Sequence, residues 1–271
     1  MREQRDEHDR GLAYDLGTVM GRRGMLGLVG GALLAGAVGC GGDRDAPASR
    51  ATAGTGTAGT ASPAAAAAGE IPDETAGPYP GDGSNGPNVL TQSGIVRSDI
   101  RRSFGSASGT AGGVPLTIEL TLADGGEPLA GAAVYLWHCD REGRYSLYSE
   151  GVTGENYLRG VQEADARGVV TFTSVFPAAY SGRWPHVHFE IYSGLADATK
   201  AATPVKTTQL AFPEAPCEAV YATAGYERSV GNLAATSLES DMVFSDGHDA
   251  QLATVTGDVS AGYKAALAVA L

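Results

Sequence analysis

The chain has 271 residues and a formal net charge of −12 at neutral pH. This acidic balance argues against a nucleic-acid partner, because a phosphate backbone needs a basic surface. Tyr (11) outnumbers Phe (6) and Trp (2), and Gly, Thr, Val and Ala dominate beyond the first ~70 residues, which is typical of a turn-rich β-domain and not of a helical bundle. Three cysteines are too few for a disulfide framework.

Residues 1–40 are predicted to be an export signal. Arg22 and Arg23 precede an apolar run over 25–38 that is too short and too Gly-rich for a convincing membrane-spanning helix. Paired arginines before such a run resemble a twin-arginine signal. The four residues that end in Cys40 resemble a bacterial lipobox, which predicts a lipid anchor on the extracytoplasmic face of the membrane; an ordinary cleaved signal with an incidental cysteine is the alternative.

Residues 41–72 are predicted to be a flexible tether. They consist almost entirely of Ala, Gly, Thr, Ser and Pro, and such a segment buries too little apolar surface to offset the entropy of ordering it. Residues 73–271 are then left for one folded domain, a length that supports a single substantial core.

The fold expected for this domain is all-β: an antiparallel β-sandwich with long loops and one or two short helices. Alternation of apolar and polar residues in LTIELTL is typical of a half-buried strand. Gly and Pro turns separate the strand-like stretches, as in other sandwiches. The helices are expected within 214–240. The predicted strands are 114–123, 132–140, 168–175, 186–193, 205–212 and 251–258.

His186 and His188 form the first candidate metal site. Residues i and i+2 of a strand point to the same face, so both imidazoles could reach one ion, while Val187 and Phe189 would face the core. An H-x-H pair alone is a weak signal, because it also occurs by chance and in several unrelated metal-binding folds.

Nearby tyrosines strengthen the metal interpretation. Tyr180 lies six residues before His186, and Tyr145 and Tyr148 lie upstream in GRYSLY. Phenolate oxygens are hard anionic donors that favour Fe(III) over softer divalent ions. Two phenolates and two imidazoles would bring two negative charges to a tripositive ion and leave room for further ligands.

The combined pattern resembles the intradiol ring-cleavage dioxygenases over roughly residues 73–271. The family shares a Trp-containing strand followed by G-x-Y-S, R-G-x-Q-x-x-D-x-x-G, P-x-x-Y, R-x-x-H-x-H and a T-x-Q segment. The corresponding residues here are Trp137, Gly143–Ser146, Arg159–Gln162 with Asp165 and Gly168, Pro177–Tyr180, Arg183–His188, and Thr207–Phe212.

This resemblance implies an enzyme that opens a catecholic ring between its two hydroxyl-bearing carbons with O2, giving a cis,cis-muconate type product. It implies non-haem Fe(III) as the cofactor. Arg183 would lie beside the ring and Gln209 would line the pocket, while Tyr180 would leave the metal and help to take up a substrate proton. Tyr148 and Tyr157 are expected to be packing residues. The implied ferric ligands are Tyr145, Tyr180, His186 and His188.

Cys139 and Cys217 both lie in the folded part of an exported chain, so a disulfide between them is plausible.

Two other functions remain open. A non-catalytic β-sandwich lipoprotein of the cell envelope would explain the signal, tether and strands, but not the joint occurrence of the tyrosines, arginine and histidines. A zinc hydrolase would need a carboxylate beside the H-x-H pair, and Glu190 could supply it from the same strand face.

Overall fold

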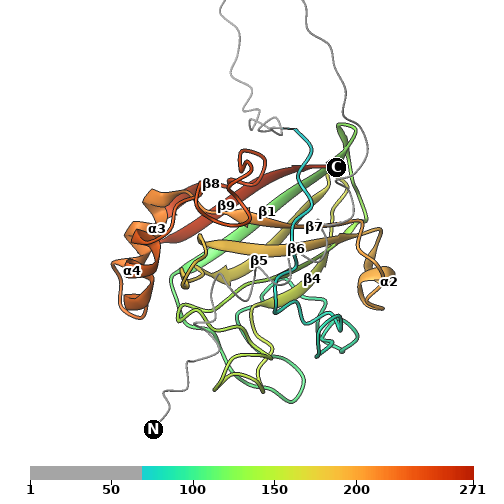
Figure 1. Ribbon diagram of the computed structural model, residues 1–271. Coiled ribbons are helices and arrows are strands. Elements are labelled where there is room, and N and C mark those ends of the chain that lie inside the picture. Colours follow the sequence, from blue (N-terminus) through green and yellow to red (C-terminus); the bar gives the residue numbers. More distant parts are fainter. Residues whose placement is uncertain (1–68) are drawn as a thin grey trace, which may run out of the picture.

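The protein is represented by a computed structural model, in which residues 69–271 are described (Figure 1). The predicted export signal, the lipobox at Cys40 and most of the predicted tether therefore lie outside the described residues. Within residues 69–271, no helix is long and apolar enough to cross a membrane.

The first sheet is built around β1 (Pro115–Asp124), whose alternate residues are buried, as its sequence pattern predicts. β1 pairs antiparallel with β5 and with the short β2, and in parallel with β9, which pairs antiparallel with β8. The remaining bounds of this sheet are β2 Glu127–Pro128, β5 Val169–Val175, β8 Thr254–Asp258 and β9 Gly262–Ala270.

The second sheet is antiparallel throughout and has the strand order β4-β3-β6-β7. Its register aligns one residue from each strand in a continuous row across the sheet. The bounds are β3 Ala133–Trp137, β4 Arg159–Glu163, β6 His186–Tyr192 and β7 Lys206–Ala211. The row consists of Arg159, Trp137, His188 and Gln209.

The two sheets pack face to face over the main hydrophobic core, with β1, β5 and β9 on one side and β3 and β6 on the other. The second sheet is unusual because its outer face is also buried. A second hydrophobic cluster covers that face, and it includes Tyr135, Trp137 and Tyr145. Every residue of β6 is therefore buried, whichever face of the sheet its side chain points to.

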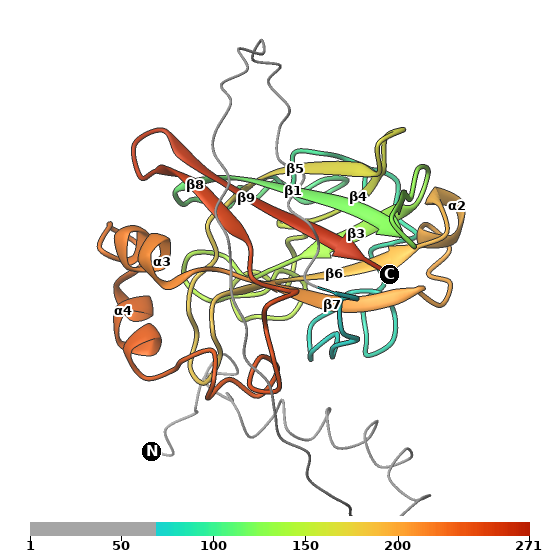
Figure 2. The ribbon, with the colours of Figure 1, turned by 90° about the horizontal axis from the view of Figure 1, so that it is seen from above.

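The irregular segment before β1 helps to cover this outer face. It begins beside β7, where the Glu74 amide donates to the Thr207 carbonyl at 2.7 Å (Figure 2). It continues to Val89, Leu90 and Ile95, which are fully buried in the second cluster.

Three short helices lie at the two ends of the sandwich. α3 (Glu214–Tyr221) and α4 (Glu227–Ala234) lie at one end, and α2 (Leu195–Ala198) lies at the other (Figure 1). The predicted all-β fold with short helices is confirmed, and α3 and α4 fall inside the stretch where helices were expected. The four-residue α2 was not predicted.

The two-residue β2 was also not predicted, nor were β4 and β9. β4 is only five residues long and contains the sequence RGVQE, which has no apolar alternation. β9 is rich in alanine, a good helix former, and adopts the extended conformation because β1 and β8 pair with its two edges.

The disulfide considered between Cys139 and Cys217 is not formed, since both are free thiols. They belong to different clusters: Cys139 lies in the outer cluster and Cys217 in the core between the sheets.

Gly168 forms the turn between β4 and β5. Its φ is +75°, and a Cβ built on it would lie 2.2 Å from the Leu122 carbonyl oxygen. Asp165 Oδ1 accepts the amides of Arg167 (2.8 Å) and Val169 (2.9 Å) in the same turn. Asp165 and Gly168, both part of the sequence pattern, thus shape this turn.

Replacement of Gly168 by Ala should lower the free energy of unfolding by more than about 2 kcal/mol, because a left-handed backbone conformation costs roughly 1–2 kcal/mol and the overlap with Leu122 adds to it. Gly131→Ala is the matched control: its φ is +80° but no atom lies within 4 Å of the built Cβ. The control should lose only about 1 kcal/mol in urea denaturation. Equal losses in the two variants would contradict the steric explanation.

Candidate active site

The two histidines of β6 lie on the outer face of the second sheet. Val187 and Phe189 point into the core between the sheets, as predicted, so His186 and His188 point away from it. Both imidazoles are 2% exposed. Strand alternation thus delivers two buried nitrogen donors to one side of the sheet.

Three donor atoms from other residues lie close to His186 Nε2, which is the fourth donor. The His188 Nε2 and the Tyr180 hydroxyl each lie 3.1 Å from it, and the Tyr145 hydroxyl lies 3.5 Å from it. Metal–ligand bonds of about 2.1 Å place neighbouring donors about 3–3.4 Å apart. The spacing of these two phenols and two imidazoles therefore fits a single bound ion.

The orientation of His186 also fits metal ligation. Its Nδ1 lies 2.5 Å from the Trp184 carbonyl oxygen, which can only accept. The Nδ1 nitrogen therefore carries the proton, and Nε2 presents its lone pair to the other three donors. A backbone carbonyl that fixes the tautomer in this way is the usual companion of a ligating histidine.

His188 is held by packing. Its ring stacks on Trp137 with centroids 5.1 Å apart and an interplanar angle of 4°. Gly77 approaches it closely, since a Cβ built on Gly77 would lie 3.1 Å from His188 Cε1. Among the described residues, the His188 Nδ1 atom is buried without a hydrogen-bond partner, so on that side packing holds the ring.

Tyr145 is positioned by a network centred on Arg159. The Tyr145 amide donates to Ser149 Oγ at 2.9 Å, and Arg159 donates to both the carbonyl and the hydroxyl of the adjacent Ser146. The same guanidinium also donates to the carbonyls of Tyr79 and Pro80 (2.9 and 2.8 Å). One buried arginine thus fixes the Tyr145 loop against the segment that precedes β1.

Helix α4 positions Tyr180. Ser229 Oγ accepts the Ala179 amide at 3.1 Å, and Asn232 Nδ2 donates to the Ala179 carbonyl at 2.9 Å. Tyr180 itself is only partly buried, whereas the other three donor side chains are buried. Among the four donors, the Tyr180 side is therefore the one nearest to solvent.

Arg183 and Gln209 meet beside the cluster. Arg183 Nη2 donates to Gln209 Oε1 at 2.7 Å, and Gln209 Nε2 donates to the Thr75 carbonyl at 2.9 Å. Arg183 Nε donates to Asp241 at 2.9 Å, and both of these charged side chains are buried. Asp241 was not predicted as a site residue, because it lies 58 positions after Arg183 and belongs to none of the sequence motifs.

Burial controls the charge of the donor atoms. Burial is the largest of the causes that lower the pKa of His186 and His188 well below the usual value. The second cause is the charge of Arg183 for His186, and the charge of His186 for His188. Burial, followed by the nearby Tyr180, raises the pKa of Tyr145. The imidazoles are therefore neutral, the form that binds metals, and a bound cation would act on the phenols in the opposite direction.

The other candidate residues lie apart from the four donors. The Tyr148 hydroxyl bonds to the Gly81 amide and to Asn85, and the Tyr157 hydroxyl donates to Asp140. Glu190 accepts hydrogen bonds from Tyr192 (2.6 Å) and Thr207 (3.5 Å). No group of three or more His, Cys, Asp and Glu side chains within residues 69–271 could hold a metal, so the described residues do not supply the carboxylate that a zinc site with Glu190 would need.

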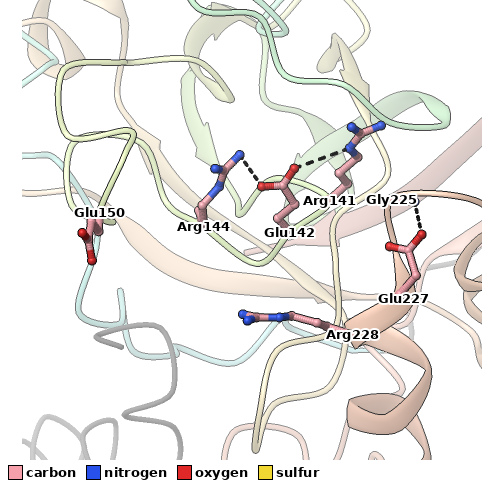
Figure 3. Close-up of a pocket in the computed structure, with 7 residues that line it drawn as sticks. All are labelled: Arg141, Glu142, Arg144, Glu150, Gly225, Glu227 and Arg228. Atoms are coloured by element: carbon pink, nitrogen blue, oxygen red, sulfur yellow. Dashed lines mark hydrogen bonds and ion pairs between the residues drawn. The ribbon is translucent and has the colours of Figure 1, made fainter. Parts of the chain in front are cut away.

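A cavity of about 470 Å³ lies beside the loop that leads into Tyr145, and none of the four donors lines it (Figure 3). Glu142 lies between Arg144 (2.7 Å) and Arg141 (3.9 Å), so much of its charge is already paired. The lining residues are Arg141, Glu142, Arg144, Glu150, Gly225, Glu227 and Arg228.

Comparison with known proteins assigns the family. A family model described as "Dioxygenase" matches residues 85–223, just over half of the chain and the part that contains all four donors. The chain belongs to the intradiol ring-cleavage dioxygenases. The resemblance noted in the sequence is thereby confirmed at the level of the family.

This intradiol dioxygenase is similar to solved structures of other dioxygenases. An intradiol ring-cleavage dioxygenase from Tetranychus urticae matches with a TM-score of 0.59 and 23% identity, covering 74% of this chain and 94% of that one. The dioxygenase domain of a carbohydrate-binding fusion protein from Streptomyces sp. SirexAA-E matches with a TM-score of 0.48 and 22% identity, over 75% and 98% of the two chains.

The sequence match to a characterised relative is short. Catechol 1,2-dioxygenase 2 from Acinetobacter lwoffii is 39% identical over 56 residues, which is 21% of this chain and 20% of that protein. The substrate and the reaction of this intradiol dioxygenase therefore have to be argued from its own residues.

Gly77→Ala should weaken iron binding by tenfold or more, the size of effect seen when residues that orient metal ligands are changed. The added methyl would lie 3.1 Å from His188 Cε1 and displace the ring. Gly86→Ala is the control, because it lies in the same segment with positive φ and nothing within 4 Å of its built Cβ. Iron titration of the full chain measures both, and an unchanged affinity in Gly77→Ala would contradict the role given to Gly77 in holding the His188 ring.

Proposed function

We propose that the protein is a non-haem Fe(III) dioxygenase that cleaves a catecholic ring between its two hydroxyl-bearing carbons with O2, giving a cis,cis-muconate type product. The observation that carries this proposal is the convergence of Tyr145, Tyr180, His186 and His188 within 3.5 Å of the His186 Nε2 atom, inside a chain of the intradiol family.

The donor chemistry supports ferric iron. Two phenol oxygens and two imidazole nitrogens suit a hard, highly charged ion better than zinc or copper, which prefer thiolate or imidazole-rich sites. When bound, Fe(III) would draw charge from a catecholate and make its ring reactive toward O2. The catechol and O2 are the small-molecule partners that this chemistry requires.

Arg183 would stabilise negative charge on the bound ring. It is 1% exposed, and its guanidinium is anchored by Gln209 and Asp241 before any substrate arrives. A preorganised cation in a site shielded from water stabilises developing charge more strongly than a mobile surface residue. Arginine suits this role because it keeps its charge at every relevant pH. Gln209 would line the same side of the pocket.

Tyr180 is the donor best suited to leave the metal when the substrate binds. It is the least buried of the four, and the contacts of helix α4 hold its backbone through Ala179. A displaced phenolate at this place could accept a proton from an incoming catechol hydroxyl. Tyr145 and both imidazoles, which are buried, would stay in place.

The full chain loaded with iron should show a red-brown tyrosinate-to-Fe(III) absorption band that shifts on anaerobic addition of catechol. Tyr145→Phe and Tyr180→Phe should each weaken or abolish the band, because each removes one phenolate. Tyr148→Phe should retain it, since the Tyr148 hydroxyl bonds to Gly81 and Asn85. A colourless iron-loaded protein with no ring cleavage across a panel of catechols would sink the proposal and favour a non-catalytic envelope-binding protein.

We also propose that the enzyme is exported and anchored to the extracytoplasmic membrane face through Cys40. The support is the sequence alone: paired arginines, a short apolar run and a lipobox-like ending. Cys40→Ser should move the protein from the membrane fraction to the soluble fraction of cells, while the exposed-loop change Asp249→Asn should not. Equal membrane association of both variants would rule out the lipid anchor.

A further inference from the structure

Asp241 is a fully buried carboxylate that contacts more than the Arg183 guanidinium. It is 0% exposed. Its Oδ2 accepts hydrogen bonds from Arg183 Nε at 2.9 Å and from the Trp184 amide at 2.7 Å. Its Oδ1 accepts the amides of Val243 (2.8 Å) and Phe244 (3.3 Å). Both oxygens are thus committed, one to the segment before β6 and one to its own turn.

Asp241 and Gln209 together leave Arg183 little freedom. Asp241 binds the Nε edge of the guanidinium and Gln209 binds Nη2. Gln209 is held in turn by the Thr75 carbonyl and by its place in β7 opposite His188. The guanidinium plane is therefore fixed by two acceptors from separate parts of the chain.

The backbone of Trp184 links Asp241 to the donor cluster. Its amide donates to Asp241, and its carbonyl accepts from His186 Nδ1 at 2.5 Å. The Trp184 indole is fixed as well, because its Nε1 donates to the Phe212 carbonyl at 2.8 Å. A shift of the Asp241 carboxylate would therefore be passed to Arg183 directly, and to the His186 ring through the backbone of the single residue Trp184.

We propose that Asp241 is a positioning residue for ring cleavage: it sets the orientation of Arg183 beside the Tyr/His cluster and holds the amide of Trp184, the residue whose carbonyl orients His186. This inference rests on the proposed function for its catalytic consequence. Its structural part, the coupling between Asp241 and Arg183, stands independently of the reaction.

A neutral residue cannot replace Asp241. In Asp241→Asn one oxygen becomes an NH2 group, which would face either the Arg183 and Trp184 donors or the Val243 and Phe244 amides. The substitution also leaves the buried guanidinium without its counter-charge. Arg183 should then leave its position even though the shape of the side chain at 241 is nearly unchanged.

The test is a double-mutant cycle on the full, iron-loaded chain with Asp241→Asn, Arg183→Gln and the double variant. Asp241→Asn should keep the tyrosinate band but lose at least about tenfold in kcat on catechol, with a smaller change in KM, because misplacing a catalytic group is costly. Adding Arg183→Gln should cause little further loss, since the two side chains act as one unit. Asp249→Asn, an exposed carboxylate eight residues on, should behave like the wild type.

Losses in kcat that multiply across the cycle would overturn the inference, as would an unchanged kcat in Asp241→Asn. Urea midpoints of the same four proteins give a second reading: the losses should be less than additive, and additive losses would overturn the coupling whatever the enzyme does. A wild-type protein without band or cleavage would instead refute the proposed function. If Asp241→Asn does not fold, Asp241→Glu keeps the charge but moves it by one methylene, and it should lower kcat in the same way.

Discussion

The burial of β6 on both faces is the constraint on which the rest of the site depends. Val187 and Phe189 fill the core between the sheets, and the same alternation presents His186 and His188 on the other face. That face is shielded by loops, so the imidazoles are kept dry and neutral. A half-exposed strand would offer the same two ligands to water, where protonation and solvation compete with a metal.

The loops that cover this face also complete the site. Arg159, Trp137, His188 and Gln209 form one row across the second sheet, and each contacts the segment before β1 or a residue of the cluster. Arg159 donates to the carbonyls of Tyr79 and Pro80, and Gln209 donates to that of Thr75. The sheet therefore acts as a rigid platform, and its polar side chains align the loops that carry Tyr145 and Gly77.

The charged groups near the four donors form one buried ion pair. None of the four donor side chains is a carboxylate, and the nearby cation Arg183 is paired with the buried Asp241. Because none of the donors is a carboxylate, the phenol oxygens would supply the negative charge for an ion bound among them. The Arg183 guanidinium is a fixed positive group beside this position. The ion pair that satisfies the buried arginine is also the contact that orients it, so under the proposed function stability and catalysis would depend on the same pair.

The all-β class, most strands of both sheets and the family were predictable from the amino-acid sequence, because strand alternation and a dense local motif are encoded within short windows. The pairing of His186 with His188 was predictable too, since two residues on one strand face are neighbours in any register. The residues that pack against them from distant segments became known only from the folded structure. β9 is a strand because β1 and β8 pair with it, despite its alanines; Cys139 and Cys217 remain free because they pack in different clusters; and Asp241 meets Arg183 across 58 positions. Contacts of this kind depend on how distant segments pack, and no local pattern in the sequence records them.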